Sequence, residues 1–365
     1  MCLSRLREAL ASRGIGTQVL AAPLSQVRLP SHLRAAVVAP ASSERIARTL
    51  CAALSPSPVL LLLEREEPPT GLFSLSDDVR ALIGVGETGA LAVRFFTSLR
   101  GGYALAVPDR PSARGIFART MPAGRWKGVP LRPADAVLFD AQAVTGRAAC
   151  YAQAALALLC EEEHTLDFVF GEGRAPELCA FSPAETGAEA LFAFDALCSL
   201  AADGAEFSCL HAARLLKEEG SAVAYAEYYA KRYSALFSGG TATPWFVPDY
   251  AARALRAAQA AGSPAAAFSR VRVPTYAQSC RLWQTFCECR EKFSLRARLL
   301  SDSVARVRAA YFSLGGKLMP CDPAPAHDLS AELSPHLSLA ALERELGRLP
   351  NPPQADIYRE CKRWI

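Results

Sequence analysis

The stretch ALIGVGETGALAVRFF, residues 81–96, decides the fold of this chain. An apolar run enters the glycine turn GVGETG at 84–89 and leaves it as a second apolar run. That order predicts a strand, a tight turn and then a helix over 90–99. Glycines in such a turn let the backbone approach a phosphate, and the start of a helix attracts anions. The same turn also occurs with no ligand, and Glu87 inside it disfavours a bound polyanion.

Strands and helices alternate on both sides of this turn. Strands are predicted at 35–42, 57–64, 79–86, 102–108 and 135–140, and helices, the first with a serine cap, at 42–54 and 90–99. The strands are almost continuously apolar, which indicates that all of them, 57–64 included, are buried strands of a parallel sheet. Ligands of such sheets bind at the carboxyl ends of the strands, where the glycine turn and the segment after Val107 lie.

The pattern changes near residue 150. Beyond it the strand signal disappears, and apolar residues recur at helical spacing in segments that glycine and proline separate. We therefore predict an α/β domain over 1–148 and a helical domain over 149–365. The helical domain is expected to hold roughly six to nine helices and a proline-rich tail from Pro320.

Composition narrows the classes of protein. The chain has 365 residues, 51% of them hydrophobic, and a net charge of +4, which is too small to indicate a nucleic-acid-binding protein. No apolar run approaches the roughly 20 residues of a membrane-spanning helix, and the amphipathic start at 1–14 does not resemble a secretory signal. The 12 cysteines contain no C-x-x-C pair, so reduced thiols and a cytoplasmic location are expected.

Two further segments carry a family resemblance. VPDRPSARG at 107–115 and PADAVLFD at 133–140 follow the glycine turn in the order seen in the metal-dependent polyol dehydrogenases. The chain resembles glycerol-1-phosphate dehydrogenase most, then glycerol dehydrogenase and the iron-containing alcohol dehydrogenases, and dehydroquinate synthase more distantly. The resemblance implies an N-terminal Rossmann-like domain with a parallel sheet and an all-α C-terminal domain, which together form the dehydroquinate synthase-like fold.

The resemblance also implies ligands. It implies NAD or NADP as the cofactor, a divalent metal such as zinc, iron or nickel, and a small phosphorylated polyol or ketone as the substrate, with a homodimer as a possible assembly. Matched residue by residue, the cofactor would contact Gly84, Gly86, Glu87, Thr88, Asp109 and Ser112, the substrate would contact Arg114 and Lys127, and the metal would be held by His211 and Glu219. Basic side chains suit a substrate phosphate, although a solvent-exposed loop is their more common setting.

The sequence departs from the family pattern at the nucleotide site. The Asp and Lys that follow the glycine turn in the family are replaced by Ala90 and Val93, with Arg94 adjacent. Asp109 stands where the family has Thr, and Arg114 stands where it has Asp. Because these polar anchors are missing, we expect weaker NAD(P) binding than in a family member that keeps them.

The metal site departs further. The family uses one Asp and two His. His211 matches the first His, Glu219 takes the place of the second, and 152–159 offers no Asp. A histidine on an apolar helix is also typical of core packing, and Glu219 is also typical of a solvated helix end. One clear ligand in place of three predicts little tightly bound metal in the purified protein.

Two functions remain open. The first is an NAD(P)-dependent polyol-phosphate dehydrogenase, nearest to sn-glycerol-1-phosphate dehydrogenase, that reduces dihydroxyacetone phosphate and has a degraded metal site. The second is a catalytically inactive homologue that acts as a binding or scaffold protein. A polar, metal-binding site around His211 would favour the first function, and a site filled by Ala, Val and Leu side chains would favour the second.

Overall fold

The computed structural model describes residues 2–30, 33–63, 70–111, 116–121, 126–164, 187–201, 213, 220–238, 290–324 and 326–327. The described residues form two compact units. The first contains those up to Ala152 together with helix α7 (Ala188–Ala201), and the second contains the rest of α5 (Ala148–His164) with α9 (Ser221–Ser238) and α13 (Arg290–Ser313). The domain limits of 1–148 and 149–365 stay a prediction.

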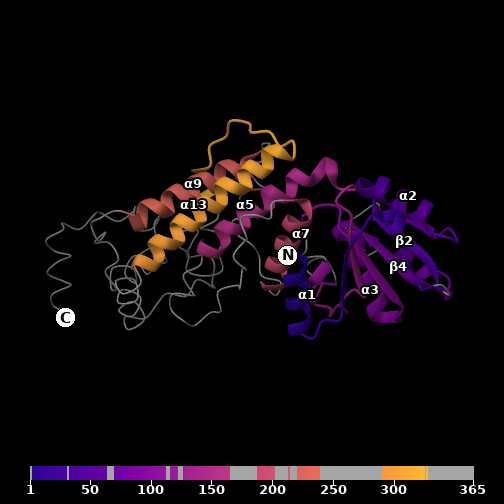
Figure 1. The fold of residues 1–365 in the computed structure, drawn as a ribbon. Helices are drawn as coiled ribbons and strands as arrows, with labels where there is room; N and C mark the ends of the chain where they lie inside the picture. Colours follow the sequence, from indigo (N-terminus) through magenta and orange to yellow (C-terminus); the bar gives the residue numbers. More distant parts are fainter. Residues whose placement is uncertain are drawn as a thin grey trace, which may run out of the picture. The chain divides into compact units, whose positions relative to one another are not determined.

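Six parallel strands form the sheet of the first unit (Figure 1). They are β1 (Gln18–Ala21), β2 (Arg34–Pro40), β3 (Val59–Leu63), β4 (Val79–Val85), β5 (Tyr103–Val107) and β6 (Ala136–Phe139). Their order across the sheet is β1-β6-β5-β4-β2-β3. From β4 the chain proceeds outward through β5 to β6, whereas β2 and β3 lie on the other side of β4. The boundary between β2 and β4 is therefore the switch point of a doubly wound sheet.

Helices cover both faces of this sheet (Figure 1). On one face, Ile46 and Leu50 of α2 (Glu44–Ala53) share an apolar cluster with Val37 of β2 and Ile83 of β4. Successive strand residues point to opposite faces, and α3 (Gly86–Arg100) packs on the other face against β2, β4 and β5. The Rossmann-like parallel sheet and the passage from this strand into a helix are confirmed. The helix begins at Gly86, four residues before the predicted start at residue 90, so the glycine segment forms the end of β4 and the first turn of α3.

Short elements complete the first unit. The 3₁₀ turns are η1 (Leu24–Gln26), η2 (Ala41–Ser43), η3 (Thr70–Ser74) and η4 (Thr145–Arg147). Helix α1 (Cys2–Ser12) packs on α7, and the ring of Phe192 in α7 stacks on Phe139 of β6 with centroids 4.4 Å apart. A helix from beyond residue 148 thus belongs to the unit that holds the sheet.

Two glycines allow α3 to approach the sheet closely. Gly84 of β4 pairs with Val38 of β2 on one side and with Ala106 of β5 on the other. A Cβ atom on Gly84 would lie 2.7 Å from the Cα atom of Ala90, and one on Gly89 would lie 2.5 Å from the carbonyl oxygen of Val38. A larger residue at either position would push the helix away from the strands. This contact therefore sets the position of the first turn of α3.

The edges of the sheet differ from the prediction. The expectation that 57–64 is a buried strand is wrong, because β3 pairs with β2 alone within the described sheet and leaves Val59 and Leu62 39% and 40% exposed. An apolar strand looks the same in sequence whether it has one neighbour or two. The edge strand β1 was not predicted, since its four residues are held by pairing with a strand more than a hundred residues away, as in Gln18 with Ala136.

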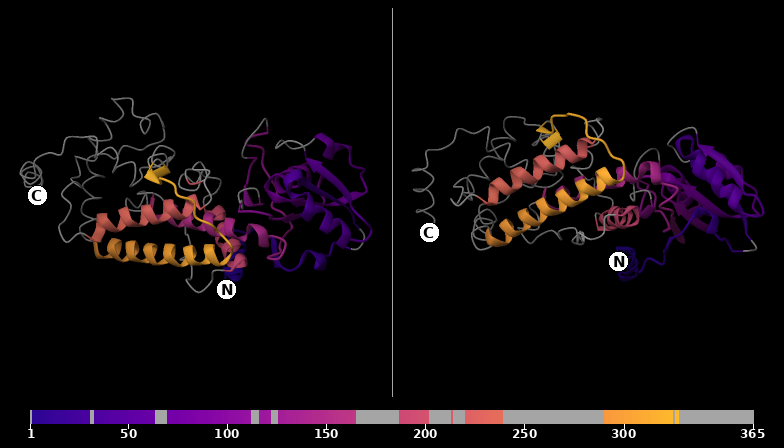
Figure 2. Two further views of the ribbon diagram at one scale, coloured as in Figure 1. Left: turned by 90° about the horizontal axis from the view of Figure 1, so that it is seen from above. Right: turned by 45° about the horizontal axis from the view of Figure 1, so that its top comes forward.

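The second unit is helical in all of its described elements. Helices α9 and α13 lie side by side (Figure 2) and bury a shared face that includes Tyr225, Val307 and Tyr311. The side chain of Gln153 in α5 donates a hydrogen bond of 3.2 Å to the Tyr311 hydroxyl. The predicted helical character beyond residue 148 is confirmed for the described residues. None of the described helices combines the length and the apolar character that a bilayer crossing requires.

Arg94 is part of the core of the first unit. Its side chain is 1% exposed, and its guanidinium group donates to the carbonyl oxygens of Ala118 and of Arg132, the latter at 2.9 Å. Burial lowers the pKa of Arg94 to about 10. The arginine beside the expected family lysine thus joins α3 to the segment before β6 through hydrogen bonds to these two backbone carbonyl groups.

We predict that Arg94→Met lowers the free energy of unfolding by about 2–4 kcal/mol, because two carbonyl oxygens lose charge-assisted hydrogen bonds. Arg94→Lys is expected to fall between Arg94→Met and the wild type, since an ammonium group lacks the planar fork of donors. Urea unfolding measures the effect. The control is Arg80→Met at an exposed position of β4, which is expected to change little. Equal stability of Arg94→Met and the wild type would contradict the structural role.

Candidate site at the sheet switch point

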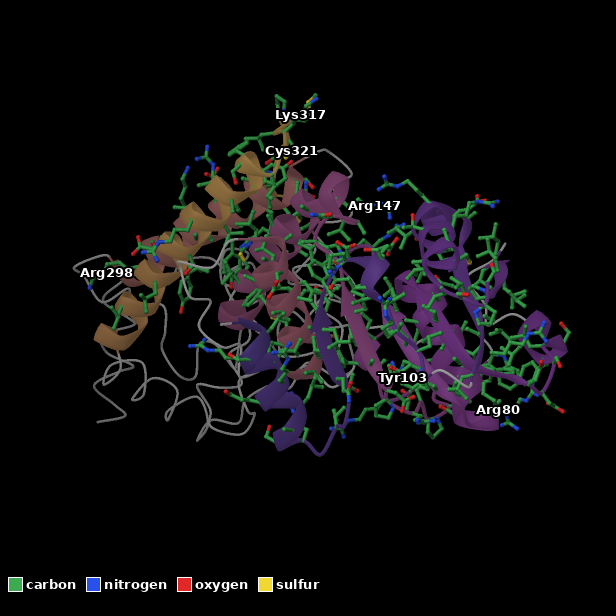
Figure 3. All side chains as sticks on the ribbon, turned by 45° about the vertical axis from the view of Figure 1, so that its right-hand side comes forward. Arg80, Tyr103, Arg147, Arg298, Lys317 and Cys321 are labelled. Carbon is green, nitrogen blue, oxygen red and sulfur yellow. The ribbon has the colours of Figure 1, made fainter. Side chains whose placement is uncertain are left out.

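The candidate site lies where β2, β4 and β5 end. Because parallel strands share one direction, the residues that follow them meet at one edge of the sheet: Ser42 and Ser43 after β2, Gly86 after β4 and Asp109 after β5. Figure 3 shows Arg147, which also belongs to this edge, at the opposite end of the sheet from Arg80 and Tyr103 at the starts of β4 and β5.

Gly86 opens α3 in a conformation that favours glycine. Its φ is +68°, and a Cβ atom there would lie 2.9 Å from Oδ1 of Asp109. The N-cap residue Val85 makes no side-chain hydrogen bond to the helix, so no side chain at that position caps the first backbone N–H groups of α3. The start of α3 therefore offers backbone donors and the positive end of a helix dipole next to a residue without a side chain.

Asp109 is the central side chain of the site. It is 1% exposed, and its Oδ2 atom accepts a hydrogen bond from the Ser43 hydroxyl and another, of 2.7 Å, from Nη1 of Arg147. The Nε atom of Arg110 lies 3.5 Å from the same oxygen. The Oδ1 atom, which faces Gly86, has no hydrogen-bond partner among the described residues. Each buried acceptor left unpaired costs about 1–3 kcal/mol, so a bound ligand that donates to Oδ1 would be favoured.

Two arginines hold this carboxylate from the solvent side. Nη2 of Arg110 donates to the Ser42 hydroxyl at 3.0 Å, and Nη2 of Arg147 donates to the Ser42 carbonyl oxygen at 2.9 Å. Both guanidinium groups are partly exposed, whereas Asp109 is buried beneath them. The ion pairs balance the charge of Asp109 and leave one of its oxygens directed at the glycine turn.

Ser43 differs from its predicted role. The sequence predicts a serine cap for the helix at 42–54, and Ser43 does occupy the N-cap position of α2. Its side chain makes no capping hydrogen bond and donates to Asp109 instead. The carboxylate is the stronger acceptor for a hydroxyl donor, and it comes from a strand that the local sequence around Ser43 does not reveal.

A buried tyrosine lies near this carboxylate. The ring of Tyr151 packs edge-on against Phe139 and Phe192, and its hydroxyl has no hydrogen-bond partner among the described residues. Burial raises the pKa of Tyr151 well above its usual value, and the negative charges of Asp195 and Asp109 raise it further. The hydroxyl therefore keeps its proton at neutral pH and stays a donor.

The other residues of the glycine turn that were predicted to contact the cofactor differ in their exposure to solvent. Gly84 faces α3, so its lack of a side chain is explained by helix packing. Glu87 and Thr88 are partly exposed in the first turn of α3. Ala90 and Val93, which replace polar residues of the family, are each 1% exposed in the core, so no polar anchor stands at these two places.

Of the predicted substrate and metal residues, Lys127 alone lies within the described residues. Lys127 is exposed, and its neighbour Trp126 packs on Phe95, about 13 Å along α3 from Gly86. The predicted contacts Ser112, Arg114, His211 and Glu219 lie outside the described residues. Within the part of the chain that the structure describes, no three His, Cys, Asp or Glu side chains stand close enough together to hold a metal ion.

The sequence analysis singled out Asp109 and missed Arg147, which pairs with it. The glycine turn and the acidic residue after the next strand are visible in the chain, since Asp109 follows Gly89 by 20 residues. Arg147 and Tyr151 carry no local signal. They reach the site because the chain returns to the sheet edge after β6, and only the fold brings that return next to β2 and β5.

No protein-family model matches this sequence, and no curated protein matches it. Similar solved structures include an iron-containing alcohol dehydrogenase from Corynebacterium glutamicum, with 13% identity, a TM-score of 0.44, and 93% of this chain and 97% of that chain covered. Glycerol dehydrogenase from Schizosaccharomyces pombe is 9% identical, with a TM-score of 0.40, and the match covers 91% of this chain and 90% of that chain. A third structure is the 2-epi-5-epi-valiolone synthase of Streptomyces hygroscopicus subsp. jinggangensis 5008, solved with NAD+ and Zn2+ bound. It is 12% identical, with a TM-score of 0.37, and the match covers 91% of this chain and 97% of that chain. Similarity at this level transfers no activity to this chain.

Proposed function

We propose that this chain binds NAD or NADP at the switch point of its sheet and acts as an oxidoreductase on a small phosphorylated polyol or ketone. The observation that carries the proposal is the buried Oδ1 atom of Asp109, which faces Gly86 and has no hydrogen-bond partner among the residues that the structure describes. The oxidoreductase class and the substrate come from the resemblance to the polyol dehydrogenases, with dihydroxyacetone phosphate as the first substrate to test.

The site residues suit a dinucleotide. The first N–H groups of α3 would hold the pyrophosphate, because Gly86 has no side chain to obstruct it. Oδ1 of Asp109 would accept a hydrogen bond from a ribose hydroxyl, while Ser43 and Arg147 keep the carboxylate in place. Both carboxylates at this turn, Glu87 and Asp109, oppose the pyrophosphate, and Arg147 and Arg110 offset that repulsion.

A bound nicotinamide supplies the hydride, which is chemistry that no side chain provides. The contribution of the chain is to bind and orient the nucleotide from the carboxyl ends of β4 and β5. No metal-assisted step is assigned, because the predicted ligands His211 and Glu219 lie outside the described residues. A second candidate, a binding protein without turnover, is favoured by the apolar side chains of Ala90 and Val93 where the family has polar anchors.

We predict that NADH binds to the purified protein and that Gly86→Ala weakens this binding by about tenfold or more, since the new methyl group lies against Asp109 and obstructs the turn. Isothermal titration measures both affinities. Gly101→Ala is the matched control, because Gly101 ends the same helix with φ +72° and has open space around it. This control also places a side chain at a positive φ, but without the obstruction. An equal loss of affinity in both variants would contradict the assignment of the glycine turn to the NADH-binding site.

We also predict that this protein oxidises NADH when it reduces dihydroxyacetone phosphate. The decrease in the absorbance of NADH measures the reaction. Gly86→Ala is expected to lose this activity together with NADH binding, whereas Gly101→Ala retains it. The assay is run with and without added zinc, iron and nickel, since metal dependence is a family property. A protein that binds NADH and oxidises none of it under any of these conditions would support the binding protein instead.

A further inference from the structure

The β4–α3–β5 unit has the spacing of a dinucleotide-binding motif that selects its ribose. Gly84, Gly86 and Gly89 form a G-x-G-x-x-G pattern that begins at a strand end and opens a helix. Asp109 follows Gly89 by 20 residues, just beyond the end of β5, which is the strand that neighbours β4. In units of this geometry an acidic side chain at the end of the second strand accepts from the 2′-hydroxyl of the adenosine ribose.

The three glycines have separate physical roles in this chain. Gly84 and Gly89 bring α3 against β4 and β2, since a Cβ atom on either would strike backbone. Gly86 adopts a positive φ and faces Asp109. The pattern is therefore more than a chance spacing of glycines, because backbone contacts require Gly84 and Gly89 and the positive φ of Gly86 favours glycine there.

The free oxygen of Asp109 defines what the site accepts. Oδ2 is occupied by Ser43 and Arg147, and Oδ1 alone remains without a partner among the described residues. A carboxylate oxygen accepts hydrogen bonds and donates none, so it binds a hydroxyl group and repels a phosphate. The repulsion is strong here because Asp109 is 1% exposed and water screens it poorly.

Arg110 and Arg147 are positively charged and could attract a phosphate. An arginine near such a site accommodates the 2′-phosphate in NADP-binding proteins. In this chain both guanidinium groups are already directed to Asp109 and to Ser42. A 2′-phosphate would have to replace Asp109 as their partner while that carboxylate stays buried beside it. We propose that Asp109 is a specificity-determining residue that selects NAD, with a free ribose 2′-hydroxyl, over NADP, an inference that rests on the proposed dinucleotide function.

The test compares NADH and NADPH by isothermal titration on the full chain. The wild type is expected to bind NADH at least about tenfold more tightly than NADPH, as the gain of a charged hydrogen bond predicts. Asp109→Asn is expected to weaken NADH binding by about tenfold and to bring the two affinities within about threefold of each other. Equal affinities in the wild type, or tighter binding of NADPH, would overturn the selection while leaving the dinucleotide function intact.

Asp140→Asn is the matched control. Asp140 is a buried carboxylate at the end of the neighbouring strand β6, and its oxygens already accept from the backbone N–H groups of Leu24, Gln142 and Ala143. This variant is expected to keep the preference for NADH even where it lowers stability. A loss of preference in Asp140→Asn equal to that in Asp109→Asn would contradict the assignment to Asp109.

A second measurement needs no variant, in case Asp109→Asn does not fold. ADP and 2′-deoxy-ADP differ by the single hydroxyl group in question, and the wild type is expected to bind the deoxy compound about tenfold more weakly. Equal binding of the two would place the 2′-hydroxyl away from Asp109 and overturn the inference. Binding of none of these nucleotides would overturn the proposed function, and the inference with it.

Discussion

The backbone contact between α3 and the sheet is the constraint on which the rest of the first unit depends. Gly84 and Gly89 let the helix lie directly against β4 and β2, and no other residue type fits at those two places without moving the helix. Because the contact is at the start of α3, it also determines where the first N–H groups of the helix point. The switch point of the sheet, the open end of α3 and the positive φ of Gly86 then coincide at one edge.

A buried carboxylate is the second constraint, and it follows from the first. Asp109 lies next to Gly86 because β5 pairs with β4 and α3 packs on the face of the sheet that these strands share with β2. A charge that is 1% exposed needs partners, and Ser43, Arg110 and Arg147 supply them from other parts of the chain. These partners satisfy Oδ2, and within the described part of the chain Oδ1 has no hydrogen-bond partner, so the arrangement that stabilises the charge also leaves an acceptor for the proposed ligand.

Much of the fold was predictable from sequence because it rests on local patterns. The apolar run 79–86 and the glycine turn after it fold as expected, since a strand that ends at glycines and continues as an apolar helix has few other solutions. The exposure of β3 and the existence of β1 were not predictable. Edge position and the pairing of four-residue Gln18–Ala21 depend on which strands lie beside them, and that information is spread over the whole chain.

For the site, the sequence by itself determined the glycine turn, the acidic residue after the next strand and the loss of polar residues at Ala90 and Val93. Only the tertiary structure decided that Arg94 serves the core, that Ser43 donates to Asp109 in place of capping its helix, and that Arg147 pairs with the same carboxylate. The physical reason is the separation along the sequence between the residues that interact. Turns and periodic faces arise from neighbours in the chain, whereas the partners of a buried charge are chosen by burial and by electrostatics among groups that folding brings together.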